Sequence, residues 1–172
     1  LRSPNVLLMS LKMSQKEPLA KVGDFGLTAA ASARLQQELL TWQWMAPEAF
    51  LGENYTETCD LYSYGMILWE IFSGTGEIPF EAVAQQEKNK KKQAREFMND
   101  IIHKNLRPSC DPSFPDDVKM LILRLWERDP NLRPTFATCL EILTNFQSGV
   151  KKPDGFLKNL LNRERARAFT TL

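Results

Sequence analysis

The string KVGDFGL at residues 21–27 places a carboxylate beside a glycine. The apolar residues before it favour a short strand, so Asp24 is expected where a strand ends and a flexible turn begins. A carboxylate at such a point suits a hard cation that carries phosphate oxygens. The Asp-Phe-Gly triplet is also a common turn sequence, so this string alone leaves a purely structural role open.

A second informative string, WMAPEAF, spans residues 44–50. Between the two strings, residues 27–46 are small and polar without a sustained period, which predicts a long functional loop. A regulatory phosphate in this loop would need a hydroxyl group to carry it. Three residues of the loop have one: Thr28, Ser32 and Thr41.

Composition describes an ordinary globular chain of 172 residues, of which 43% are hydrophobic. The formal net charge of +1 predicts no general attraction to nucleic acid or to a membrane surface. The three cysteines form neither a disulfide framework nor a Cys-x-x-Cys metal site, so we expect a reducing, cytoplasmic environment. No apolar stretch approaches the roughly 18 residues of a transmembrane helix.

The first elements that position these strings are two strands and a helix. Residues 6–9 and 20–22 are short apolar segments that flank a polar, proline-containing stretch, which predicts an antiparallel pair. Residues 61–72 are apolar on nearly all sides and are followed by Gly74. This pattern predicts a helix that is buried on most faces and ends at the glycine.

Further helices are predicted from apolar residues at helical spacing. Two stripes share the pattern i, i+3, i+4, i+7, i+8: Ala94, Phe97, Met98, Ile101 and Ile102, and then Val118, Leu121, Ile122, Leu125 and Trp126. Another helix is expected over 135–146, with four residues facing inward: Phe136, Cys139, Leu140 and Leu143. Residues 147–172 are predicted to form a C-terminal extension with a short helix.

Together, the strings resemble the protein kinase catalytic domain. Asp24-Phe25-Gly26 and Ala46-Pro47-Glu48 match the signatures that bracket the kinase activation loop, and LRSPN resembles the second half of the catalytic loop H-R-D-L-x-x-x-N. The strings DLYSYG, PF and WERDPNLRPTF follow in the family's order, at 60–65, 79–80 and 126–136. The resemblance covers residues 1–146 and is greatest to the tyrosine-kinase-like branch, in particular to Roco-type kinases.

The resemblance implies an α+β, mainly helical fold: a kinase C-terminal lobe with a short β-hairpin at its start and the N-lobe absent. The glycine-rich loop, the strand lysine with its glutamate partner and the His-Arg-Asp triplet would all precede Leu1. We therefore expect part of an ATP-dependent serine/threonine kinase that is inactive as this chain alone. The alternative is a kinase-derived scaffold or pseudokinase module whose exposed face is covered by a partner.

By the same resemblance, ATP and Mg²⁺ are the implied cofactors. Asn5 and Asp24 would hold the metal, and Arg2 would approach the transferred phosphate, although an arginine stands where most serine/threonine kinases have lysine. Leu7 would form the floor beneath the adenine ring, and it suits a core position equally well.

The remaining implied roles are structural. Glu48 and Arg133 correspond to a buried ion pair that ties the activation segment to the late helices. Asp60 is expected to accept backbone N–H bonds from the catalytic loop. Thr41 corresponds to a threonine near the substrate-binding turn, and it favours serine/threonine specificity.

The sequence also offers candidates for a regulatory site and for partners. Ser32 beside Arg34 is the favoured activating phosphosite, with an unmodified serine as the alternative. The basic run at 85–95 is expected to be a solvated helix face, and docking of an acidic partner is the alternative. The expected partners are a protein substrate, ATP, and either the missing N-lobe or a covering partner, without nucleic acid or a transmembrane segment.

Overall fold

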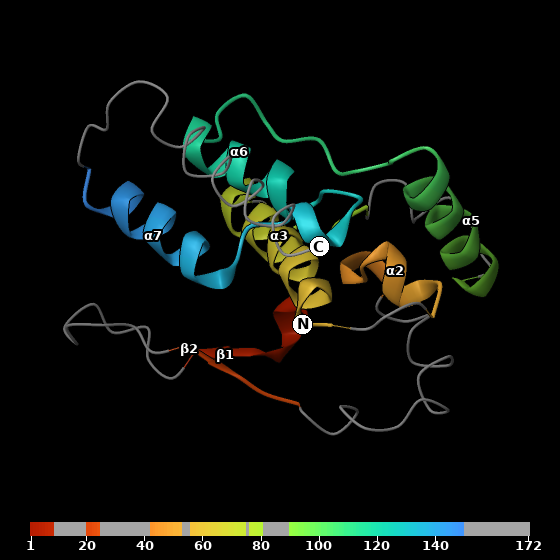
Figure 1. Cartoon of the computed structure of the whole chain (residues 1–172). Coiled ribbons are helices and arrows are strands. Elements are labelled where there is room, and N and C mark those ends of the chain that lie inside the picture. Colours follow the sequence, from red (N-terminus) through yellow and green to blue (C-terminus); the bar gives the residue numbers. More distant parts are fainter. Residues whose placement is uncertain (9–19, 25–41, 53–55, 75, 81–89, 150–172) are drawn as a thin grey trace.

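The computed structural model describes residues 1–8, 20–24, 42–52, 56–74, 76–80 and 90–149, and of residues 90–94 it describes the backbone alone. Helices dominate this part of the chain, and a two-stranded antiparallel hairpin stands at its start (Figure 1). The predicted fold class is therefore confirmed. The elements follow in the order η1 Ser3–Asn5, β1 Val6–Leu8, β2 Ala20–Val22, η2 Trp42–Trp44, α2 Pro47–Phe50, α3 Glu57–Ser73, α5 Lys90–His103, α6 Asp116–Leu125, η3 Pro130–Leu132 and α7 Phe136–Gln147.

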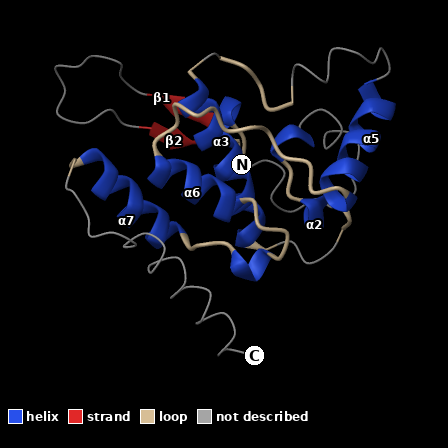
Figure 2. Cartoon of the chain, turned by 90° about the horizontal axis from the view of Figure 1, so that it is seen from above, coloured by secondary structure: helices blue, strands red, loops and turns tan. Residues whose placement is uncertain are grey.

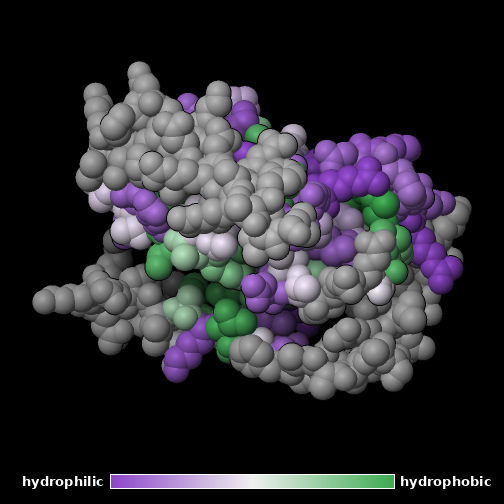
Figure 3. Space-filling model, viewed as in Figure 1, coloured by the Kyte–Doolittle hydropathy of each residue, from purple (hydrophilic) through white to green (hydrophobic). Residues whose placement is uncertain are grey.

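The hairpin pairs Val6 with Val22, and Leu8 with Ala20. This confirms the predicted strand pair, although Met9 lies outside the described residues. Unlike the helices, the hairpin contributes few residues to the core: three of its large apolar side chains are exposed, namely Leu7, Leu8 and Val22. Hydrophobic residues are visible at the surface where Figure 1 places the hairpin (Figure 3).

Helix α3 is the centre of the fold. It is capped at its start by the Thr56 hydroxyl and ends at Gly74, whose φ of 64° is left-handed and favours glycine. Its side chains are buried over most of its length, as predicted, and it packs mainly against α6. Both views show α7 and α5 at opposite ends of the molecule, with α3 and α6 between them (Figures 1 and 2).

The predicted apolar stripes of α5 and α6 both face the core. In α5, Met98, Ile101 and Ile102 are buried and Phe97 packs partly buried against the core, whereas the side chain of Ala94 lies outside the described residues. In α6 and the residue after it, the whole predicted stripe is buried, from Val118 to Trp126. None of the helices in the described ranges is long and apolar enough to cross a membrane.

The close contact of α3 with α6 depends on Gly65. A Cβ atom there would lie 2.8 Å from Nε1 of Trp126 and 2.9 Å from Cβ of Leu125. We expect Gly65→Ala to destabilise the fold by about 1–3 kcal/mol through overpacking, although alanine is the better helix former. Urea denaturation followed by tryptophan fluorescence measures this, with Ile71→Ala, at a 63% exposed position of the same helix, as the control. A Gly65→Ala variant as stable as the wild type would contradict the prediction.

The prediction for α7 was right for Cys139, which is buried, and for Leu143, which packs partly buried against the core, but it was wrong for two residues. Phe136 and Leu140 were expected to face inward, yet they are 45% and 68% exposed. The buried residues are Thr138, Cys139 and Ile142. Apolar side chains lie on more than one face of this helix, so their spacing did not identify the packed face. Thr138 can be buried because its hydroxyl is within hydrogen-bond distance, 3.2 Å, of the Thr135 hydroxyl.

The sequence did not assign the positions of the short elements η1, η2, α2 and η3. Trp42–Trp44 forms the 3-10 turn η2, inside the segment expected to be a loop, and Pro47–Phe50 forms the single-turn helix α2. A proline at the helix start and Glu48 in the first turn are the local signals that favour α2.

Candidate active site

The hairpin brings Asn5 and Asp24 to the same place. Asn5 directly precedes β1, and Gly23 directly follows β2, so the strand register sets them opposite each other. The backbone N–H of Gly23 donates to the carbonyl of Asn5 over 2.8 Å. Asp24 is the next residue, and both predicted metal-binding residues therefore lie at one end of the hairpin.

Arg2 reaches the same point. Its Nη2 lies 3.4 Å from Oδ2 of Asp24, and the two side chains are 30% and 47% exposed. The backbone of Asp24 has a φ of 62°, in the left-handed region that aspartate tolerates better than most residues. An accessible carboxylate and the side-chain amide of the half-buried Asn5 offer oxygen ligands of the kind that Mg²⁺ prefers. This donor set fits a metal that also binds phosphate oxygens.

Helix α3 holds the segment that carries Arg2 and Asn5. The charged α-amino group of Leu1 donates to Oδ1 of Asp60 over 2.9 Å. Asp60 lies in the first turn of α3, where the helix dipole favours a negative charge. Asp60 therefore lies where it can anchor the residues before η1.

Glu70, near the other end of α3, contacts two turns at once. The Ser3 hydroxyl donates to its Oε1 and the Trp44 indole N–H to its Oε2, each over 2.8 Å. Burial raises the pKa of the Glu70 carboxyl, and the two hydrogen bonds oppose this shift. Sequence reasoning missed this residue. The available signal was one carboxylate in a helix that is otherwise apolar from Leu61 to Phe72.

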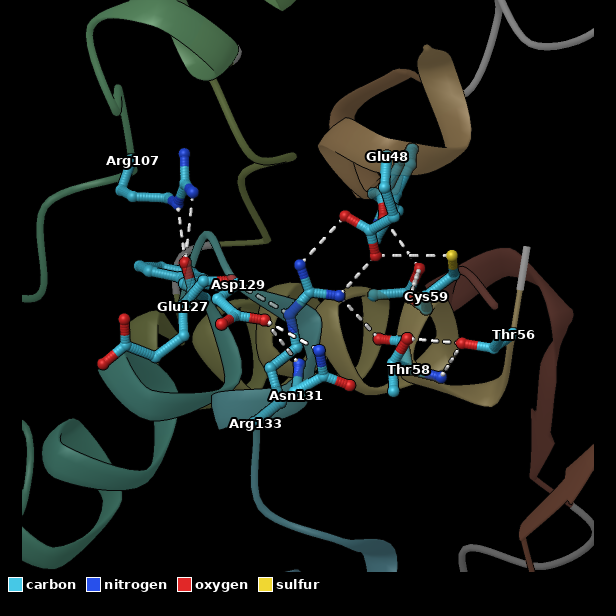
Figure 4. A network of polar contacts seen from close by, with 12 residues as sticks. Glu48, Thr56, Thr58, Cys59, Arg107, Glu127, Asp129, Asn131 and Arg133 are labelled. Carbon is cyan, nitrogen blue, oxygen red and sulfur yellow. Dashed lines mark hydrogen bonds and ion pairs between the residues drawn. The ribbon is translucent and has the colours of Figure 1, made fainter. Parts of the chain in front are cut away.

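Glu48 and Arg133 form a buried ion pair between α2 and the segment after η3 (Figure 4). Both terminal nitrogens of Arg133 donate to the Glu48 carboxylate, the second over 3.0 Å. Arg133 also donates to the carbonyls of Thr58 and Glu127, over 2.8 and 3.0 Å. Burial alone would raise the pKa of Glu48, but the hydrogen bond and charge of Arg133 hold it below its ordinary value.

The same network includes an aromatic ring and a thiol. The Tyr62 ring contacts both Arg107 and Arg133, and each guanidinium carbon lies 5.2 Å from the ring centroid. Burial raises the pKa of Tyr62 to about 12. Burial, together with the neighbouring charge of Glu48, also raises the pKa of the Cys59 thiol, to about 11. Both groups are therefore neutral near pH 7 and act as packing for the ion pair.

Other predicted site residues lie apart from these clusters. The side chain of Leu7 is 55% exposed, so it is not in the core. The remaining ones fall outside the described residues: Thr28, Ser32 and Thr41.

Comparison with known proteins gives a consistent result. The family model described as protein tyrosine and serine/threonine kinase matches residues 1–143. The chain is 38% identical over 149 residues to the probable serine/threonine-protein kinase roco7 of Dictyostelium discoideum, an alignment that covers 86% of this chain and 5% of the relative. It is 40% identical over 148 residues to roco11 of the same organism, described in the same words, with coverage of 85% and 9%.

A more distant relative is mitogen-activated protein kinase kinase kinase 7 of Homo sapiens. It is 31% identical over 145 residues, which cover 84% of this chain and 22% of the relative. The chain thus corresponds to a small part of each of these relatives, and the predicted similarity to Roco-type kinases is confirmed. The chain belongs to the protein tyrosine and serine/threonine kinase family.

Proposed function

We propose that these 172 residues form the C-terminal lobe of a serine/threonine kinase domain that transfers the γ-phosphate of ATP to protein hydroxyl groups. The observation that carries the proposal is the meeting of Arg2, Asn5 and Asp24 at one end of the hairpin, in a chain of the kinase family. Serine/threonine specificity is supported by the descriptions of the roco7 and roco11 relatives.

The chemistry follows from charge and position. Phosphoryl transfer spreads negative charge over several oxygens, so catalysis depends mostly on placement and on neutralising that charge. In the proposed site Asn5 and Asp24 would hold Mg²⁺, which would supply positive charge to neutralise the nucleotide phosphates. Arg2 adds a fixed positive charge beside them. Asp60 and Glu70 keep the segment that carries Arg2 and Asn5 against α3.

We also propose that these residues act with a lobe encoded before Leu1. The 172 residues contain neither a G-x-G-x-x-G string nor a His-Arg-Asp triplet, and the family uses both for ATP binding and proton acceptance. The aspartate that accepts the hydroxyl proton would directly precede Leu1. By this proposal the chain alone transfers no phosphate.

The test compares the 172-residue chain with an extended protein. This extended protein consists of the same 172 residues preceded by the residues that the upstream coding sequence encodes. With ATP, Mg²⁺ and a generic protein substrate, we expect phosphate transfer by the extended protein and none by the chain alone. An extended protein that binds partners without transferring phosphate would instead support the scaffold or pseudokinase alternative. Transfer by the chain alone would overturn the assignment of the proton acceptor.

A further inference from the structure

We propose that Glu70 is a positioning residue that holds the segment carrying Arg2 and Asn5 in a fixed place relative to the turn formed by Trp42–Trp44. This inference rests on the proposed function, because it concerns how the same site is held in its active arrangement. Glu70 itself touches neither nucleotide nor metal in this scheme. It acts through Ser3 and Trp44.

The geometry is that of a bridge. Ser3 and Trp44 are 67 and 26 residues away from Glu70 in the sequence, yet each donates to a different oxygen of its carboxylate over 2.8 Å. Ser3 lies directly after Arg2 and within η1, the turn that ends at Asn5. Trp44 is the last residue of η2 and is only 6% exposed. A single side chain therefore links the two turns.

Helix α3 provides a rigid support for the two hydrogen bonds of Glu70. Glu70 belongs to a 17-residue helix whose core positions are buried, so its own backbone has little freedom. Each of the two turns is also tied to α3 at a second point nearer the start of the helix: Leu1 to Asp60, and the Trp44 carbonyl to the Ser63 hydroxyl over 2.7 Å. Without Glu70, each turn would keep only one of these two polar attachments to α3.

The chemistry of the group suits this role. Hydrogen bonds to a carboxylate are stronger than those between neutral partners, and both oxygens are used. A half-buried carboxylate without donors would be costly, so the helix tolerates Glu70 because of these two partners. Glutamine would accept one bond through its amide oxygen and would present an amino group to the other donor.

The test uses steady-state kinetics of the extended protein. For Glu70→Ala we expect kcat to fall about 10- to 100-fold, because small misplacements of positioned groups cost rate on this scale. The KM for ATP should stay within about twofold, because ground-state binding of the nucleotide is not affected. Glu70→Gln, Ser3→Ala and Trp44→Phe should each give a smaller loss of kcat.

A double-mutant comparison of Ser3 and Glu70 distinguishes positioning by Glu70 from a general effect on folding, because the losses of kcat should not add. If Ser3 acts through Glu70, Ser3→Ala will lower kcat in the wild type and cause no further loss in Glu70→Ala. Ile71→Ala, a neighbouring substitution at an exposed position, serves as the matched control and should keep wild-type kcat. If Glu70→Ala does not fold, the pair Ser3→Ala and Glu70→Gln carries the same comparison.

The outcomes are distinct. An active wild type whose kcat is unchanged by Ser3→Ala and by Trp44→Phe would overturn the role of Glu70 and leave the proposed function standing. Loss of kcat that tracks the melting temperature in every variant would also overturn it, because that pattern indicates a merely structural contact. A wild-type extended protein without phosphate transfer would overturn the proposed function itself, together with this inference.

Discussion

Replacing Arg133 with methionine will destabilise the folded protein by about 3–5 kcal/mol, the usual cost of leaving one partner of a buried ion pair without its counter-charge. The side chain of Arg133 is fully buried, and Glu48 is only 6% exposed. The substitution also removes donors to the carbonyls of Thr58 and Glu127. Urea denaturation of the extended protein, followed by tryptophan fluorescence, measures the change in the free energy of unfolding.

A surface pair of similar length provides the control. Lys104, the residue directly after α5, has its Nζ 2.8 Å from Oδ1 of Asp100, but its side chain is 71% exposed. Lys104→Met should cost about 0.2–1 kcal/mol, because water screens exposed pairs. The double substitution of Arg133 and Glu48 by methionine should recover much of the loss, since no buried charge is then left unpaired. A loss for Arg133→Met no larger than that for Lys104→Met would contradict the prediction.

The pH dependence has a defined sign. The pKa of Glu48 is lower in the folded protein than in the unfolded chain, so the pair stabilises the fold above the ordinary glutamate pKa. This contribution is lost as the pH falls below about 4 and Glu48 becomes protonated. Without Arg133, burial will instead raise the pKa of Glu48, and the neutral acid is then the better-tolerated form. The difference in stability between wild type and Arg133→Met should therefore shrink on acidification.

Several helices of this fold could be predicted from the sequence, because in each of them one local property determines the structure. Helices α5 and α6 each have one apolar stripe, so there is one face to bury. Helix α3 ends where a glycine takes a left-handed backbone conformation. Helix α7 differs, because apolar residues lie on more than one side and its neighbours decide which side packs. The packed face of α7 depends on tertiary contacts, so the spacing of the apolar residues in 135–146 does not identify it.

The same distinction applies to the candidate site. Asn5 and Asp24 were identified through short strings, and the strand register that brings them together follows from two apolar segments. Glu70 was not identified, because its partners come from distant turns and no string contains all three residues. A carboxylate in an apolar helix indicates a buried polar contact, but the identity of the contact depends on how the turns pack on α3.

The second large effect concerns the metal. Asp24→Asn in the extended protein should lower phosphate transfer at least about a hundredfold, because metal stabilisation of the transition state supplies several kcal/mol and each 1.36 kcal/mol is tenfold in rate. Asparagine has the shape of aspartate and tolerates a left-handed backbone, so the φ of 62° should persist. The substitution removes the negative charge and leaves only neutral amide oxygens, at positions 5 and 24, to bind the metal. Transfer of radiolabelled phosphate at several Mg²⁺ concentrations measures the effect.

The free energy of unfolding of the Asp24→Asn variant distinguishes a metal-binding role of Asp24 from a structural one. The Arg2–Asp24 contact is 3.4 Å long and partly exposed, so losing it should change the free energy of unfolding by less than about 1 kcal/mol. Asp117→Asn, at an exposed position in the first turn of α6, removes the same charge far from the hairpin and should retain full activity. If Asp24 holds Mg²⁺, the Asp24→Asn variant should need more Mg²⁺ for half-maximal transfer while melting like the wild type. Activity within a few-fold of wild type at every Mg²⁺ concentration would show that the carboxylate is not a metal ligand, and the meeting of Arg2, Asn5 and Asp24 would then need another explanation.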